Sequence, residues 1–207
     1  MFTILKPEMR RCIEALDPYL TEAGFKIDSR HSIPNWTSTA KEIYSFQLSD
    51  PKFASEFGVY LWMTKNFFGD SAVAYQISRG ESLEDDLKHL MQVKSTFRSD
   101  LSRKLDDPIN FMVNLDKLST YQPAKLGKQG TIMIEGDPLE EGNFDGRWDY
   151  FFFKHIHTSD NTHVHEKEEG VLRAHGIYND QINEEQWNQM VEMGTLTPPR
   201  KEVYSNG

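Results

Sequence analysis

The stretch "SAVAYQISRGESLEDDLKHLM", residues 71–91, contains a predicted strand, a turn and the start of a predicted helix. Residues 71–78 are mostly β-forming and apolar, and Gly80 marks the turn after them. Ser82, followed three residues later by Asp85, is a pattern typical of a helix N-terminus. Apolar residues then recur at helical spacing, at Leu83, Leu87, Leu90, Met91, Phe97 and Leu101. The stretch therefore predicts a strand joined by a short turn to a long helix.

Further strands and helices are predicted on both sides of this unit. "FTIL", residues 2–5, is a short apolar run typical of a buried strand, and Pro7 is placed to open a helix after it. Gly24 is a plausible end for that helix, and a second strand follows it. Towards the C-terminus, "DYFFFKHIH" (149–157) predicts a strand and "INEEQWNQMVEM" (182–193) predicts a helix. This order predicts an α+β fold whose sheet is covered on one face by helices.

Composition limits the class of protein. The chain has 207 residues, of which 38% are hydrophobic, and this is enough for a core. We expect one domain over residues 1–195 and a C-terminal tail over residues 196–207. The formal charge is −9 and no long basic run occurs, which argues against binding to duplex nucleic acid. The single cysteine, Cys12, excludes an intrachain disulfide, and without a signal-like or membrane-spanning stretch we expect a cytoplasmic protein.

Four of the seven histidines lie between residues 149 and 166. In a regular strand His155 and His157 would share one face, and His163 and His165 would do the same if their segment were extended. Together with Glu166 they could bind zinc or another divalent metal, so a metal-binding protein or metalloenzyme is one hypothesis. A second is that these histidines are ordinary half-buried or solvated residues. A third is that one of them carries a phosphoryl group.

Five segments, in the same order along the chain, resemble signatures of the nucleoside diphosphate kinase family. They are "FTILKPEMRR" (2–11), "EAGFKI" (22–27), "SAVAYQISRGES" (71–82), "STYQPAKLGKQGTIMIEGD" (119–137) and "KHIHTSDN" (154–161). The resemblance covers Phe2 to about Glu168, with extra material near residues 101–118 and 138–149. It implies a ferredoxin-like fold with a four-stranded antiparallel sheet and helices, together with assembly into a homo-oligomer.

The resemblance also implies a reaction. His157 would accept the γ-phosphoryl group of a nucleoside triphosphate and pass it to a nucleoside diphosphate, with Mg²⁺ bound to the nucleotide. Glu168, eleven positions later, would be the carboxylate partner of the imidazole, and Ser159 would donate a hydrogen bond nearby. Lys6, at the end of the first predicted strand, would bind phosphate.

Further residues are candidates for nucleotide binding through the same resemblance. Tyr44 matches a tyrosine at the edge of the family site, and Thr120 matches a loop threonine that contacts phosphate. Phe53 or Phe57 would stack on the base, because every base offers a π-face. A structural role is the alternative for each: core packing for the two phenylalanines and a cap or turn for Thr120.

The sequence departs from the family pattern at charged positions. Met133 and Asn114 stand where the family has arginines, so two positive charges are lost, and methionine cannot make a charge-assisted bond to phosphate. Thr158 replaces the glycine after the histidine, and Lys154 replaces an asparagine. Compensating cations could come from Lys154, Arg147, Lys117, Lys128, Arg98 or Arg103. An alternative alignment uses His175 in place of His157.

The lost arginines also leave a different function open. The chain could bind nucleotides without turning them over and act as a sensor or interaction module.

Overall fold

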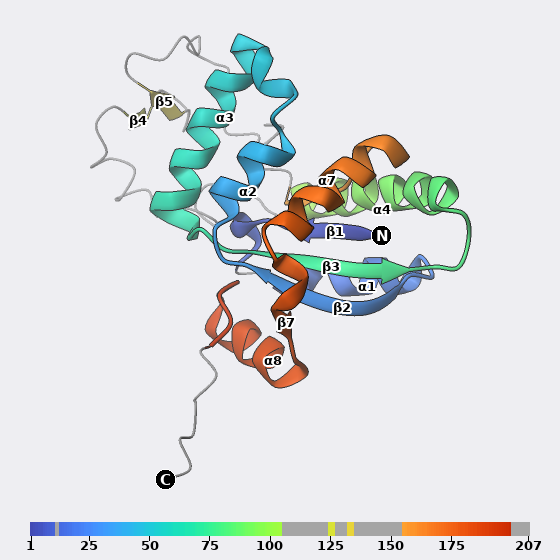
Figure 1. The fold of residues 1–207 in the computed structure, drawn as a ribbon. Helices are drawn as coiled ribbons and strands as arrows, with labels where there is room; N and C mark the ends of the chain where they lie inside the picture. Colours follow the sequence, from blue (N-terminus) through green and yellow to red (C-terminus); the bar gives the residue numbers. More distant parts are fainter. Residues whose placement is uncertain (11–12, 105–123, 127–131, 135–154, 200–207) are drawn as a thin grey trace.

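The structure is a computed structural model that describes residues 1–10, 13–104, 124–126, 132–134 and 155–199 (Figure 1). The expected insertions lie outside these residues, apart from residues 101–104, and so do Thr120 and Asn114.

A five-stranded sheet forms the centre of the molecule, with strand order β6-β1-β3-β2-β7 and every neighbouring pair antiparallel. Its strands are β1 (Phe2–Leu5), β2 (Lys26–Ile33), β3 (Ala72–Ser78), β6 (Ile156–His157) and β7 (Gln181–Ile182). A separate antiparallel pair consists of β4 (Ala124–Leu126) and β5 (Ile132–Ile134). The α+β class is confirmed, and the sheet is compatible with a broadly ferredoxin-like arrangement. The expected number of four strands was wrong, because the two-residue strand β7 extends the edge beyond β2 and is too short to give a sequence signal.

Helices cover both faces of the sheet, whereas the sequence predicted cover on one (Figure 1). One face packs against α2 (Trp36–Ile43), α3 (Pro51–Met63) and α7 (Thr162–Ala174). The other packs against α1 (Asp17–Glu22), α4 (Leu83–Lys104) and α8 (Glu184–Met193). All four residues of β1 are buried, so this strand needs helices packed against both of its faces.

Central strand β3 divides its side chains between two cores. Ala72 and Ala74 point into the core beneath α2, α3 and α7, while Val73, Tyr75 and Ile77 point into the core beneath α1, α4 and α8. The small residues on one side and the large residues on the other follow the period of two expected of a strand.

Helix boundaries follow local sequence signals in most places. Ser82 caps α4, because its Oγ accepts a bond from the backbone N–H of Asp85 at 3.2 Å. Gly24 ends α1 with a φ of 80°, as its predicted role requires. The helix expected from Pro7 is instead a pair of short 3₁₀ turns, Pro7–Met9 and Ile13–Leu16, before α1.

The remaining short elements are 3₁₀ turns at Gln47–Ser49 and Ile177–Asn179 and a π-helical turn at Thr64–Phe68. Within the described part of the chain, no helix combines the length and the apolar character needed to cross a membrane. Leu196, at the start of the segment expected to be a tail, is buried in the core beneath α8.

Candidate functional site

Strand β1 places two of the candidate residues close together. His157 lies in β6 opposite Ile4 of β1, and the hydroxyl of Thr3 donates to the His157 carbonyl at 3.0 Å. Lys6 follows β1 directly, and its backbone N–H donates to the carbonyl of His155 at 2.9 Å. The first strand therefore fixes both the proposed nucleophile and the proposed phosphate-binding lysine.

Both ring nitrogens of His157 have hydrogen-bond partners. Nδ1 lies 2.9 Å from the hydroxyl of Tyr44, and Nε2 lies 2.9 Å from Oε2 of Glu168. Burial raises the pKa of Tyr44 above its ordinary value, so its hydroxyl keeps its proton and is a donor. Glu168 as a carboxylate only accepts. The neutral imidazole therefore carries its proton on Nε2, and its lone pair on Nδ1 faces Tyr44.

Glu168 is buried and yet charged. Burial alone would raise its pKa, but the neighbouring His157 and hydrogen bonds from His157 and Ser159 outweigh burial, so the pKa is lowered from 4.5. The hydroxyl of Ser159 donates to Oε2 at 2.6 Å. Glu168 reaches this position because α7 begins at Thr162, where the side chain of Asn161 caps the helix, and runs past β6.

Lys6 is buried between two tyrosines. Its Nζ lies 5.9 Å from the ring centre of Tyr44 and 5.2 Å from that of Tyr60, and the residue is only 1% exposed. Desolvation lowers its pKa to about 8, although the nearby carboxyl of Glu8 acts in the opposite direction. Glu8 is buried as well, and desolvation raises its pKa. Lys6 and His157 both lie near the ring of Tyr44, whose centre is 5.9 Å from Nζ of Lys6 and 5.3 Å from the centre of the imidazole.

The predicted strand over residues 149–157 is described only from His155 onwards, and His155 does not have the extended backbone that regular alternation requires. This residue has a φ of 65°, in the left-handed region that a non-glycine residue rarely adopts. The prediction that His155 and His157 share a strand face is therefore wrong. His155 is buried, and desolvation together with Lys6 and Arg98 lowers its pKa to about 3, so it is neutral.

His163 and His165 lie in helix α7, whereas an extended segment was considered for them. His163 is exposed, but His165 is buried against Phe2, with ring centres 4.8 Å apart. In the described residues no three histidine, cysteine or acidic side chains gather as metal ligands would. The alternation on which the metal hypothesis was based is absent.

The aromatic candidates differ in exposure. Phe57 is 2% exposed and packs against Tyr44 and Tyr60, so in this arrangement it has no ring face open to a base. Phe53 is half-buried and packs on Tyr44 and Phe57. Phe46, which the sequence analysis did not select, is 80% exposed.

Helix α4 contributes cations that lie close to His157. Of the six compensating cations considered from sequence, the structure describes the side chain of Arg98, which donates to the carbonyl of Ile156 at 2.7 Å. Lys94, one turn earlier, lies 3.6 Å from the carboxylate of Asp160. Burial lowers the pKa of both cations. Lys94 and Arg98 are four residues apart, so the helical spacing that places them on one face was readable from sequence.

Two buried polar atoms beside His157 have no hydrogen-bond partner in the described structure. They are Nδ1 of His155 and Oγ1 of Thr158, one on each side of His157 in sequence. Such atoms are uncommon, because an unpaired buried polar group costs free energy, so each calls for a ligand or water.

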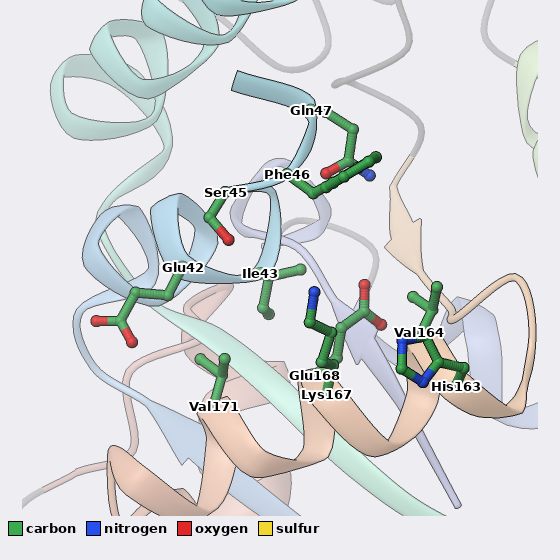
Figure 2. Close-up of a pocket in the computed structure, with 10 residues that line it drawn as sticks. All are labelled: Glu42, Ile43, Ser45, Phe46, Gln47, His163, Val164, Lys167, Glu168 and Val171. Carbon is green, nitrogen blue, oxygen red and sulfur yellow. The ribbon is translucent and has the colours of Figure 1, made fainter. Parts of the chain in front are cut away.

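A pocket of about 320 Å³ adjoins this cluster (Figure 2). It lies between the end of α2 with the turn that follows and one side of α7. Its apolar lining comes from Ile43, Val164 and Val171. The pocket is also lined by Phe46 and Lys167, and Nζ of Lys167 lies 5.9 Å from the centre of the Phe46 ring. Glu168 is part of the lining, so a molecule in the pocket would lie next to the side chain that holds His157.

The structure brings together five candidate residues from four separate places in the chain: Lys6, Tyr44, His157 with Ser159, and Glu168. His175, the alternative histidine, is elsewhere and bonds Glu42 at 2.9 Å. Comparison of the chain with models of known families, with curated proteins and with solved structures finds no match.

Proposed function

We propose that this protein is a phosphotransferase that carries a phosphoryl group on Nδ1 of His157, between a nucleoside triphosphate and a nucleoside diphosphate. The observation that carries the proposal is the pair of partners on the His157 ring, Tyr44 at Nδ1 and Glu168 at Nε2, since a nucleophilic imidazole needs one nitrogen unprotonated and the other held. The nucleotide as substrate rests on the family resemblance of the ordered motifs.

The two half-reactions balance without an additional reactant. The Nδ1 lone pair attacks the γ-phosphorus, an N–P bond forms, and the bond from phosphorus to the β,γ-bridging oxygen breaks. The departing nucleoside diphosphate keeps that electron pair. A terminal oxygen of a second nucleoside diphosphate then attacks the phosphorus and releases His157. Mg²⁺ enters as part of the nucleotide substrate and neutralises phosphate charge.

The chain's own cations support the phosphoryl group in this scheme. Arg98 and Lys94 both contribute to lowering the pKa of Lys6, and Arg98 contributes to lowering that of Lys94, so the three charges lie near each other. Together they supply positive charge that Met133 and Asn114 do not. The unpaired atoms of His155 and Thr158 are further partners for phosphate oxygens.

Tyr44 has a specific part in the cycle. Its hydroxyl occupies the approach to Nδ1, and its ring covers Lys6. A phosphoryl group that bonds to Nδ1 must displace this hydroxyl, and the movement uncovers the lysine at the same time. Tyr44 is therefore proposed to keep His157 in its reactive tautomer until substrate arrives.

The test is labelling of the intact chain with γ-labelled ATP and Mg²⁺. We expect an acid-labile, base-stable label that a nucleoside diphosphate removes, and no label in His157→Ala. His175→Ala is the matched control, because His175 is the alternative histidine and should label normally. No acid-labile label in the wild type, or equal label in His157→Ala, rejects the proposal.

A second candidate function is nucleotide binding without turnover, in a sensor or interaction module. The burial of Lys6 and the replacement of the two arginines favour it. Calorimetry would then show a nucleotide bound by a protein that is never labelled. Failure to bind any nucleotide rejects both functions.

A further inference from the structure

His165 contacts the hydrogen-bonded cluster through Ser159. It lies on α7 three residues before Glu168, so the two side chains project from neighbouring positions on one helix face. Its Nδ1 is 3.3 Å from Oγ of Ser159. The ring stacks on Phe2 of β1 with an interplanar angle of 23°, and the residue is 3% exposed, which fixes its orientation.

The proton positions in this cluster follow from simple counting. Ser159 has one hydroxyl proton, and it is donated to Glu168 at 2.6 Å. Oγ can then only accept from Nδ1 of His165, so this ring carries its proton on Nδ1. The bonds run from His165 to Ser159 and from Ser159 to Glu168, which also accepts the Nε2 proton of His157.

We propose that His165 is a positioning residue for His157. By donating to Ser159 it holds the serine hydroxyl on Glu168, and Glu168 so oriented keeps the proton of His157 on Nε2 and the lone pair on Nδ1. The effect of His165 on catalysis rests on the proposed function, whereas the effect of His165 on the tautomer of His157 does not. The alternative is that His165 only fills space between α7 and Phe2.

Two substitutions separate these roles. His165→Asn keeps an N–H donor near the position of Nδ1, and His165→Leu keeps apolar bulk against Phe2 without a donor. The first readout is the ¹⁵N NMR spectrum of ring-labelled histidine in the intact protein, with the His157 signals assigned from His157→Ala. We expect an unprotonated Nδ1 and a protonated Nε2 in the wild type and in His165→Asn, and a mixture of tautomers in His165→Leu.

The second readout is the rate of labelling by γ-labelled ATP. Because His165→Leu loses the hydrogen bond from His165 to Ser159, we expect its labelling rate to be about tenfold lower than that of wild type. Recovery to within about threefold of wild type is expected in His165→Asn, since the donor is restored. A lower rate with unchanged Michaelis constant marks positioning of the nucleophile and not loss of nucleotide binding.

The outcomes are distinct. Wild-type ring signals in a folded His165→Leu overturn the positioning role and leave packing alone. Altered ring signals with no labelling of the wild type reject the phosphotransferase but keep the positioning role. If His165→Leu does not fold, Ser159→Ala breaks the same link without touching the packed ring, and unchanged His157 signals there overturn the proposal equally.

Discussion

At the scale of single residues, the site depends on charges that burial opposes. Glu168 remains ionised because two donors, Nε2 of His157 and the hydroxyl of Ser159, end on its carboxylate. Lys6 has a lowered pKa because burial beside the rings of Tyr44 and Tyr60 disfavours its charge more than the carboxyl of Glu8 favours it. For Glu168 the partners lower the pKa more than burial raises it, whereas for Lys6 burial lowers the pKa more than Glu8 raises it.

Glu168→Gln tests the first case through the pH dependence of stability. A carboxyl whose pKa is lowered by folding stabilises the protein above its unfolded pKa, here about 4.5, and this is lost as pH falls through the folded value. We expect the variant to be less stable by about 1–3 kcal/mol near pH 6, with the difference shrinking as the pH falls below 4.5. Urea unfolding across this range measures it, and the exposed Glu166→Gln is the control. A difference in stability that does not shrink at any pH below 4.5 at which the protein stays folded contradicts the prediction.

Lys6→Met tests the second case, and the sign is opposite. The folded pKa is about 8 and the ordinary value is 10.5, so the burial cost of the charge is complete below pH 8 and disappears as pH rises to 10.5. At pH 7 the unfolding free energy of the variant should equal that of wild type or exceed it by up to about 3 kcal/mol. Labelling of His157 should fall at least about 100-fold. Its stability advantage should shrink towards pH 10.5.

The exposed Lys41→Met is the matched control for Lys6→Met, since it removes a lysine at no burial gain. Thermal or urea unfolding at pH 7 and pH 10 gives the comparison. A Lys6→Met protein that is markedly destabilised at pH 7, or labels normally, would show that the lysine has a structural role.

At the scale of elements, strand–turn–helix signals predicted the framework well. The β3–α4 unit has its strand, its Ser82 cap and its helix where the sequence places them. The extended conformation considered for the segment around His163 and His165 was wrong, because two histidines at i and i+2 are too short a pattern to indicate a strand. Asn161 before a run rich in Glu and Lys was the stronger signal, since asparagine caps helices well.

The candidate site was predictable only in part, for a physical reason. The spacing of eleven residues between His157 and Glu168 carries no information on contact until α7 is known to fold back past β6. The burial of Lys6 under Tyr44 and Tyr60 depends on α2 and α3 packing over β1, which a linear sequence does not reveal. Arg98 was considered for its charge, but its bond to Ile156 depends on how α4 packs against β6.

Helix α7 should respond to its N-terminal cap. The side chain of Asn161 accepts a bond from the backbone N–H of Val164 at 3.0 Å, and Asn161→Ala removes it at a cost of about 1 kcal/mol in unfolding free energy. Asn161→Asp keeps the acceptor and adds a favourable charge at the helix N-terminus, so it should be as stable as wild type. The urea unfolding midpoints of wild type and the two variants measure this difference. Equal losses of stability in both variants would exclude capping as the cause.

At the scale of the whole molecule, the sheet separates the site from a second core. Tyr44 packs in the core with α2, α3 and α7, and Glu168 lies on α7, while α8 packs on the opposite face of the sheet (Figure 1). Among the described side chains, each face has a buried tryptophan with a polar partner. Nε1 of Trp36 donates to the hydroxyl of Tyr60 at 2.6 Å, and the ring of Trp187 lies 4.3 Å from the guanidinium carbon of Arg30.

These two tryptophans give a matched pair of substitutions. Trp187→Phe reduces packing and the cation–π contact with Arg30, and Trp36→Phe removes the donor to Tyr60, whose ring lies beneath Lys6. We expect both to lose about 1–3 kcal/mol of stability, measured by urea unfolding. Labelling of His157, measured well below the unfolding transition, should fall severalfold in Trp36→Phe and stay unchanged in Trp187→Phe. Equal loss of labelling in both folded variants would mean that the two faces are coupled through β3 and β1, and that the site depends on the stability of the whole sheet.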